Sequence, residues 1–526
     1  MSGLRVESGH ARSRDHEGDR GDLRRHRRDG NPSRVPRDPA RAGEPRARPA
    51  DPRRQDRDHR GRRGAVRGLA QAPAGAGRGR GRDVRAWGSR PAAGSGHVTA
   101  GLRRELGVLP LAAVIFFNVS GGPYGIEDSV SSFGPGLALL LLALTPLVWS
   151  LPVSLAMSEL ASAIPDEGGY VTWVRRAYGP FWSFQVGWWS WLDSFVDIAA
   201  YPILFVEYVR LWWPAMSPLE RWLLALGFIW GLTLLNVAGV KLVGSAAVVC
   251  AGLALAPVAL MTVAALMRAT AAPWRPWAAE GQGSRSIGLG LAVVMWNYSG
   301  WDTPATVLGE TRSPERAFRV ATLVALVVIT LAYLLPVGAA LSAGGDWESW
   351  KSGALPAIAT SIGGPALGHL VGAGAVMSTA GLFLSLLLTN SRLPYVLARD
   401  GQMAGALARV HRRFGTPWVA VIVSAVFYSA FAVFSFRELI VLNMWLYSLS
   451  LLIELAAFLR LRRREPQLRR PYVVPGGRSG ALVVVALPAA CALLAMATAG
   501  VLNAAVAIAA ALTGPIAYVA FSGSRR

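Results

Sequence analysis

Long apolar stretches recur along this chain from about residue 107 to its last residues, and the charged residues lie mainly between them. About 20 residues at 1.5 Å each cross the hydrocarbon core of a bilayer. Because backbone polar groups in a bilayer must bond within their own segment, such stretches fold as helices. We therefore predict an all-α membrane protein of about twelve transmembrane helices. The expected spans are 107–132, 135–160, 181–209, 219–239, 242–267, 286–308, 318–343, 366–389, 417–435, 438–459, 480–500 and 502–522.

The basic residues between these spans predict the orientation of the chain. Of the 54 Lys and Arg residues, 25 lie in residues 1–97, which leaves 29 in the apolar part. If the N-terminus is cytoplasmic, 22 of these 29 fall on the cytoplasmic side, as the positive-inside rule requires. We therefore expect a multi-pass protein of the cell inner (cytoplasmic) membrane with both termini in the cytoplasm.

Residues 1–97 differ in composition from the rest of the chain. They hold 25 Arg and 12 acidic residues with almost no large apolar ones, so we predict that this tail is disordered. A basic tail of this kind could bind a membrane surface or nucleic acid. The interpretation we favour is an over-extended start, with initiation near Val98. The membrane domain then covers residues 98–526, and no nucleic-acid partner is expected.

Two of the predicted helices are interrupted. The first carries three glycines and a proline within Ser120–Gly125, and the sixth carries Asn297–Gly300 followed by Pro304. Gly and Pro disfavour helix, and unwound backbone inside a membrane is tolerated where it lines a cavity. The breaks lie five helices apart, at equivalent positions of two possible five-helix halves, which is typical of a transporter binding site. Either break alone could also be a simple kink.

Several short segments together resemble one known family. They are Asn118–Val130 (NVSGGPYGIEDSV), Ile164–Tyr170 (IPDEGGY), Tyr178–Trp182 (YGPFW), Tyr201–Leu204 (YPIL), Trp301–Asp302 with Gly309–Glu310, Ala398–Gly401 (ARDG) and Arg470–Pro475 (RPYVVP). In this order they resemble the amino acid–polyamine–organocation (APC) transporters, in particular the branch of polyamine and amino-acid permeases. The resemblance covers about residues 105–480, and the tail before residue 98 has no counterpart in it.

The resemblance implies a fold of the leucine-transporter type. In that fold two five-helix repeats are inverted relative to each other, with broken helices 1 and 6 and two further helices at the C-terminus. The first repeat would cover about 107–267, the second about 286–459, and helices 11 and 12 about 480–522.

The first break supplies one set of candidate binding residues. Backbone N–H groups at a half-helix end favour a carboxylate, so Gly121 and Gly122, beside Ser120, could bind an amino-acid carboxylate. Two acids, Glu127 and Asp128, follow the break. Because adjacent helical residues point about 100° apart, we expect one of this pair to face the cavity. Tyr124 is a candidate for closing the cavity or for cation–π contact.

The third and sixth helices supply the other candidates. Asp193 and Asp197 are four residues apart, so they share one helix face, and we take Asp197 as a substrate or proton site. Around the second break the candidates are Asn297, Tyr298, Trp301 and Asp302. Acids from three helices that meet at one cavity would create a negative field suited to ammonium groups.

We therefore predict a permease for amino acids or polyamines that works by alternating access and favours cationic substrates. Coupling to protons is our expectation, with exchange as a further option. A sodium site beside Ser378, Thr379 or Ser385 is less favoured, because such hydroxyls routinely bond to helical carbonyls. The alternatives are a neutral amino-acid permease and a nutrient sensor built on a transporter fold. We expect no enzyme activity, cofactor or metal, since no nucleotide or metalloenzyme motif is present; the oligomeric state is left open.

Overall fold

A computed structural model of the chain describes residues 101–279, 294–351, 353–432, 436–498 and 501–523. These residues belong to one compact unit, Ala93–Arg526. The predicted disordered tail, 1–97, and the first part of the predicted sixth span, 286–293, lie outside the described residues.

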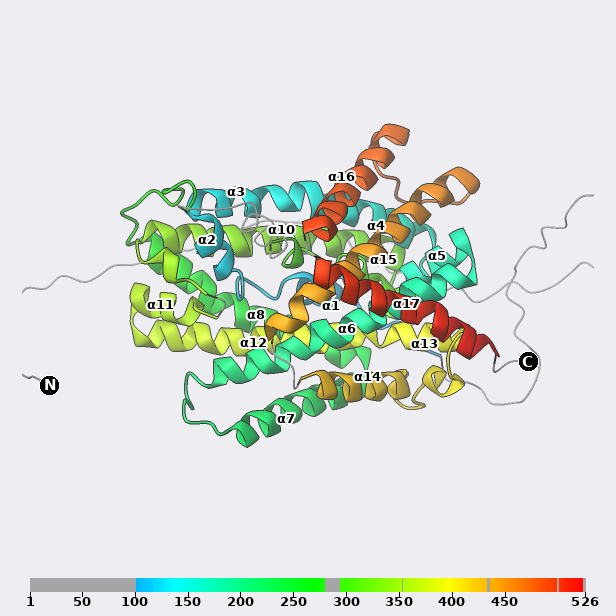
Figure 1. Ribbon diagram of the computed structural model, residues 1–526, viewed down its shortest axis with the longest axis horizontal. Helices are drawn as coiled ribbons and strands as arrows, with labels where there is room; N and C mark the ends of the chain where they lie inside the picture. Colours follow the sequence, from blue (N-terminus) through cyan, green and yellow to red (C-terminus); the bar gives the residue numbers. More distant parts are fainter. Residues whose placement is uncertain (1–100, 280–293, 352, 433–435, 499–500, 524–526) are drawn as a thin grey trace, which may run out of the picture. The chain divides into compact units, whose positions relative to one another are not determined.

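The described part of the unit is helical (Figure 1). The α-helices are α1 (Val108–Val119), α2 (Glu127–Phe133), α3 (Pro135–Thr145), α4 (Leu151–Ala163), α5 (Tyr170–Tyr178), α6 (Pro180–Val209), α7 (Pro218–Val237), α8 (Val240–Leu266), α10 (Pro314–Ser342), α11 (Leu355–Gly363), α12 (Pro365–Asn390), α13 (Arg392–Arg399), α14 (Trp418–Phe431), α15 (Phe436–Arg464), α16 (Gly477–Thr498) and α17 (Val501–Gly523). The π- or 3-10-helical segments are η1 (Pro146–Ser150), η2 (Thr303–Glu310), η3 (Trp347–Ser349) and η4 (Gly405–Ala408).

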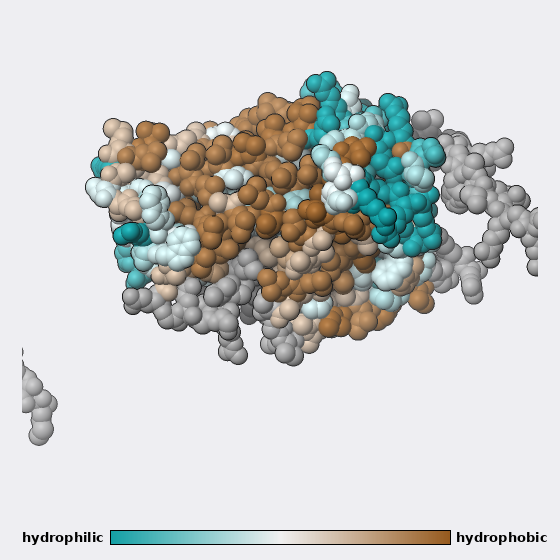
Figure 2. Space-filling model, turned by 90° about the horizontal axis from the view of Figure 1, so that it is seen from above, coloured by the Kyte–Doolittle hydropathy of each residue, from teal (hydrophilic) through white to brown (hydrophobic). Residues whose placement is uncertain are grey.

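Seven helical segments of the described chain are long and apolar enough to cross a bilayer. They are Pro135–Ala163, Pro218–Val237, Val240–Leu266, Pro314–Ser342, Pro365–Arg399, Gly477–Ala497 and Ala504–Phe521, and the shorter α1 and α14 are also apolar. Their outer faces carry large apolar side chains that the rest of the unit does not cover, such as Leu234, Leu266 and Val519. Figure 2 shows hydrophobic side chains over most of one face and hydrophilic ones gathered toward one end. The chain is therefore a multi-pass membrane protein.

The long helices begin and end close to the predicted positions, for reasons visible in the sequence. The clearest start is that of α7, where Ser217 and Glu220 form a capping box that satisfies two free backbone N–H groups. The predicted span 135–160 is one continuous helical rod with a π-helical turn at Pro146–Ser150, where prolines remove backbone donors.

Three short helices, α5, α11 and α13, are absent from the predicted spans. Helix α5 is amphipathic: Tyr170, Val171 and Val174 are buried, while Arg176 on the other face is exposed. Helices of eight or nine residues are too short to cross a bilayer, so hydropathy alone does not indicate them.

The buried centre of the unit lies around α1. This helix packs against α8, α10 and α12, and every residue from Leu111 to Val119 is buried. Helix α6 in turn packs against α12, α15 and α17. The broken first helix therefore ends inside the protein rather than at a lipid-facing surface.

Candidate functional site

The first break separates α1 from α2 over Ser120–Ile126. Three of its glycines have positive φ angles, 73° at Gly121, 106° at Gly122 and 92° at Gly125, which other residues rarely adopt. The hydroxyl of Ser378 on α12 donates to the carbonyl oxygen of Gly121 at 2.6 Å. The glycine conformations and the hydrogen bond from α12 therefore stabilise the non-helical backbone of the break.

The backbone amides of the break already have partners in this conformation. Gly121 N donates to the Phe116 carbonyl oxygen at 3.2 Å, and Gly122 N donates to Ser120 Oγ at 3.0 Å. The predicted use of these two N–H groups for a substrate carboxylate would require them to leave these acceptors.

Glu127, at the start of α2, bonds to the C-terminal part of the break. Its carboxylate accepts from Gly125 N at 2.7 Å and from Leu355 N at 3.0 Å, and its side chain is 1% exposed. It therefore joins the break to the start of α11 instead of lining a cavity. The neighbouring Asp128 is partly buried and also lies outside the cavity lining.

The second break covers Asn297–Asp302, before η2. Gly300 has a φ of 97°, and a Cβ atom there would collide with the carbonyl oxygen of Asn118 at the end of α1. Only glycine allows this close approach, so the second break touches the end of α1, just before the first break.

A cavity lies beside the two breaks, with a volume of about 890 Å³ including the part open to solvent. Helices α6, α12 and α15 complete its walls. It is lined by Asn118, Val119, Ser120, Tyr124, Gly125, Asp193, Ser194, Asp197, Tyr201, Leu204, Tyr208, Trp296, Asn297, Ser299, Gly300, Thr303, Ser378, Thr379, Leu382, Leu386, Asn390 and Tyr447.

The lining carries acidic side chains and, among the described residues, no Lys or Arg. Asp193 and Asp197 both lie on it, as their four-residue spacing predicts, and Tyr201 donates to Asp197 Oδ1 at 3.4 Å. Trp296 also lies beside Asp197. The two aspartates and the aromatic rings together form one wall of the cavity.

Asp302 lies just behind this wall. Its Oδ1 accepts from the Tyr447 hydroxyl at 2.8 Å, and the same hydroxyl oxygen accepts from Gly300 N at 3.0 Å. Asp302 is 3% exposed and is not itself a lining residue. The Tyr447 hydroxyl therefore lies between Asp302 and the cavity.

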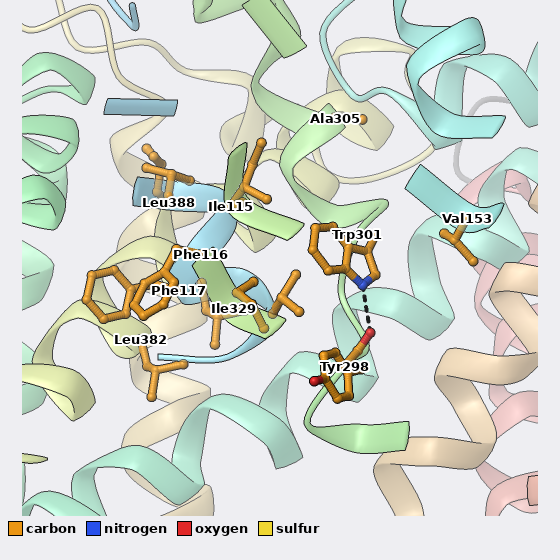
Figure 3. Packing of buried hydrophobic residues seen from close by; sticks show 14 of the residues in the cluster. Ile115, Phe116, Phe117, Val153, Tyr298, Trp301, Ala305, Ile329, Leu382 and Leu388 are labelled. Atoms are coloured by element: carbon orange, nitrogen blue, oxygen red, sulfur yellow. Dashed lines mark hydrogen bonds between the residues drawn. The ribbon is translucent and has the colours of Figure 1, made fainter. Parts of the chain in front are cut away.

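Two of the predicted aromatic residues point away from the cavity. Trp301 is fully buried, and its indole N–H donates to the Tyr298 carbonyl oxygen at 2.7 Å (Figure 3). The Tyr298 hydroxyl donates to the Leu142 carbonyl oxygen at 2.9 Å. Figure 3 shows both rings in the apolar packing with Ile329 and Val153. In this conformation they stabilise the second break.

The cavity thus includes four of the predicted binding residues: Ser120, Tyr124, Asp197 and Asn297. Tyr124 donates to the Ala254 carbonyl oxygen at 2.9 Å, and Tyr333 donates to the Asn297 carbonyl oxygen at 2.9 Å. The other predicted residues, Gly121, Gly122, Glu127, Asp128, Tyr298, Trp301 and Asp302, lie around the breaks without lining it.

Two buried acids were absent from the predicted site: Glu167, before α5, and Glu454, on α15. All four of their carboxylate oxygens lack a hydrogen-bond partner among the described residues. Glu454 lies within the expected span 438–459, and an acid inside an apolar span is itself a functional signal. Glu167 lies in a polar loop, where nothing in the sequence indicates burial.

Fold and site together define a class of protein. Packed helices with lipid-facing apolar surfaces, two helix breaks and an acidic cavity beside them are features of a membrane transporter. The chain belongs to the amino acid permease family, which matches residues 106–521. The predicted resemblance to the APC permeases is therefore confirmed.

Three similar proteins carry names that describe them as transporters or exchangers. A probable polyamine transporter of Arabidopsis thaliana is 34% identical over 397 residues, 75% of this chain and 79% of the relative. The polyamine transporter PUT1 of Oryza sativa subsp. japonica is 34% identical over 389 residues, 74% of this chain and 72% of the relative. The serine/threonine exchanger SteT of Bacillus subtilis (strain 168) is 25% identical over 334 residues, 61% and 74% of the two chains.

Proposed function

We propose that this permease is a secondary active transporter of small organic cations, namely polyamines or cationic amino acids. The observation that carries the proposal is the cavity lining, which has Asp193 and Asp197 and no described base, with Asp302 directly behind it. The plant relatives that are similar over most of the chain are named as polyamine transporters, which supports the same class of substrate.

Electrostatics favour an ammonium ligand in such a cavity. A unit charge about 4 Å from a carboxylate gains roughly 4 kcal/mol at an effective dielectric constant of about 20. An anion would lose a similar amount, and a carboxylate ligand would also need the amides of Gly121 and Gly122 to change partners. Tyr and Trp rings in the wall add cation–π attraction for an alkylammonium group.

We further propose that the chain crosses the cell inner membrane twelve times, with both termini cytoplasmic and two inverted five-helix repeats. The helices at the predicted positions and the contact between the second break and the end of α1 support this architecture. Alternating access would then move one repeat against the other around the fixed cavity. Coupling to protons or substrate exchange belongs to the same proposal.

A neutral amino-acid permease is the second candidate. The similarity to a serine/threonine exchanger favours it, as do the lining hydroxyl and amide groups of Ser120, Ser378 and Asn390. In that case the acids of the cavity would handle protons instead of binding substrate.

Competitive uptake into proteoliposomes tests the two candidates. Labelled putrescine is challenged with spermidine, arginine, leucine and glutamate, and labelled leucine is tested in parallel. We expect putrescine uptake, competed best by spermidine. Leucine uptake without putrescine uptake would select the neutral permease, and no uptake of either would contradict both candidates.

The variant Asp197→Asn tests the role of the acidic wall. Loss of one charged contact costs about 1.5–3 kcal/mol, so we expect a roughly tenfold or larger rise in the KM for putrescine. The matched control is Glu207→Gln, an exposed acid on the same helix that pairs with Arg210 at 2.7 Å. An unchanged KM in Asp197→Asn would contradict the proposed contact.

A further inference from the structure

A buried carboxyl group on α15 has no role in the site described above. Glu454 is 1% exposed, and neither carboxylate oxygen has a hydrogen-bond partner among the described residues. Two other buried acids are paired with arginines: Glu159 with Arg462 and Glu310 with Arg392. An ionised carboxylate without donor or cation is costly inside a membrane protein, whereas the neutral acid is tolerated. The surroundings of Glu454 in this conformation therefore favour its neutral, protonated form.

Two polar groups on the same face of α15 lie between Glu454 and the cavity. Tyr447, Ser450 and Glu454 are spaced at i, i+3 and i+7, so they share that face. Tyr447 lines the cavity and donates to Asp302 at 2.8 Å, and Ser450 Oγ lies 3.4 Å from Ser190 Oγ on α6. Seven residues of helix separate Tyr447 from Glu454 by about 10 Å along the axis.

The ionisable groups around Glu454 come from several elements. Asp302 lies within electrostatic range of it, and so do the Tyr170 and Tyr447 hydroxyl groups. The elements packed against α15 are α4, α5, α6, α16 and α17. Ionisable side chains on these elements include Glu159 on α4, Tyr170 on α5, Asp193 on α6, Cys491 on α16 and Tyr518 on α17. Glu159 is neutralised by Arg462 and Arg470, whereas Asp302 has no Lys or Arg partner among the described residues.

We propose that Glu454 is the proton-binding group of this transporter, and that its proton and the cation in the cavity weaken each other's binding. The inference rests on the proposed function, since it requires a cationic substrate. In the step itself the Glu454 carboxylate takes up one proton to become a neutral carboxylic acid and later releases it; no other bond changes. A proton on Glu454 removes part of the negative field that the cation shares with Asp302. By linkage the bound cation opposes protonation equally.

Exchange of protons for cations follows from this antagonism. On the more acidic side Glu454 is protonated and the cation is released, and on the more alkaline side the cation binds as the proton leaves. We therefore expect putrescine to enter proteoliposomes faster when their interior is more acidic than the outside.

The variant Glu454→Gln tests the inference, because glutamine resembles the neutral acid in shape and cannot titrate. We expect at least a fivefold effect of the pH gradient on putrescine uptake by the unchanged protein and less than a twofold effect in Glu454→Gln. Putrescine–putrescine exchange at equal pH should persist in both. Glu454→Asp keeps a carboxyl group and should retain the gradient effect. The control Glu465→Gln changes an acid just after α15 that pairs with Arg176 at 2.6 Å, and should behave like the unchanged protein.

The outcomes separate the two proposals. If the unchanged protein exchanges putrescine but does not respond to the pH gradient, or responds with the opposite sign, the inference is overturned and the transport function stands. A Glu454→Gln protein that still responds fivefold overturns it as well. If the unchanged protein shows no putrescine exchange, the proposed function fails first. If Glu454→Gln is inactive even in exchange, the putrescine Kd is measured against pH in the unchanged protein and in Glu454→Asp. The inference requires the Kd of both proteins to fall as pH rises. A Kd that does not change with pH overturns it.

Discussion

At the scale of single residues, the buried acids of this protein fall into two groups. Most have specific partners, as when Arg392 donates to both carboxylate oxygens of Glu310, at 2.7 and 3.1 Å, with both side chains fully buried. Glu167 and Glu454 have none among the described residues. A buried carboxyl group must be paired, or else it must be neutral. The unpaired acids are therefore the positions where this protein can respond to pH.

Glu167 gives a prediction about stability. Its loop lies outside the membrane-spanning helices, and its side chain packs against Gly309. Burial, and then the nearby charge of Glu310, raises the pKa of Glu167 well above its usual range, although Arg392 and Arg399 act in the other direction. The folded protein therefore binds a proton that the unfolded chain has lost. Its stability should fall as pH rises from the ordinary glutamate pKa through the raised one, and then level off.

The variant Glu167→Gln should remove this part of the pH dependence. We expect a thermal midpoint close to that of the unchanged protein near pH 5 and a higher midpoint, by about 2–4 °C, near pH 8. Scanning fluorimetry in detergent from about pH 5 to 8 measures it, with the exposed neighbour Asp166→Asn as the control. Parallel curves for Glu167→Gln and the unchanged protein would contradict the prediction.

At the scale of the elements, the two helix breaks depend on contacts with neighbouring helices. Ser378 on α12 bonds to one break, Tyr333 on α10 bonds to the other, and Gly300 of the second break touches the end of α1. Because unwound backbone in a membrane needs such partners, the breaks are stable only within the packed bundle. This makes their glycines sensitive positions even where they contact no ligand.

The variant Gly121→Ala tests this dependence. Gly121 has a φ of 73°, and a Cβ there would collide with Leu382 and with the Ser378 hydroxyl. We expect uptake to fall at least tenfold, because the backbone conformation alone costs about 1–2 kcal/mol and the contact with α12 must shift. Initial uptake rates, normalised to purified protein, measure the effect.

Gly227→Ala provides the matched control for that test. Gly227 lies within α7 and no atom lies within 4 Å of a Cβ added there. Alanine favours helix over glycine by about 1 kcal/mol, so transport should be unchanged and the thermal midpoint equal or higher. Equal loss of uptake in both variants would show that the break itself is not the sensitive feature.

At the scale of the whole membrane unit, ion pairs link elements that are distant in sequence at one end of the helices. Arg175 and Arg176 of α5 pair with Asp400 and Glu465 respectively. Figure 1 shows α5 and α13 toward one end of the helices and α11 toward the other. The predicted orientation places the end with α5 in the cytoplasm.

Labelling of introduced cysteines tests this orientation. With Cys250 and Cys491 first replaced by Ala, we expect Glu348→Cys, in η3, to react with a membrane-impermeant maleimide on intact cells. Arg412→Cys, between η4 and α14, should react only after the membrane is opened. Both native residues are exposed, so access does not limit either reaction. The reverse pattern would contradict the predicted sidedness.

Much of the fold could be predicted because its signals are local. The helices α6, α7 and α8 lie within two residues of their expected ends, since apolar length and capping residues such as Ser217 act along the chain. The breaks were also visible, because Gly and Pro disfavour helix wherever they occur. The site was predicted only in part: Ser120, Tyr124, Asp197 and Asn297 line the cavity, whereas Glu127 and Trp301 have structural partners.

The sequence by itself determined that the chain is a helical membrane protein of the amino acid permease family with two interrupted helices. The free energy of transfer into the bilayer and the helix preference of the backbone depend on residue type. Both can therefore be estimated from the sequence without knowing how the helices pack. Only the tertiary structure decided which acids face the cavity, which lie behind Tyr447, and which, like Glu454, are left without a partner. Those outcomes depend on the rotation of each helix about its axis. That rotation is fixed by contacts between helices far apart in sequence.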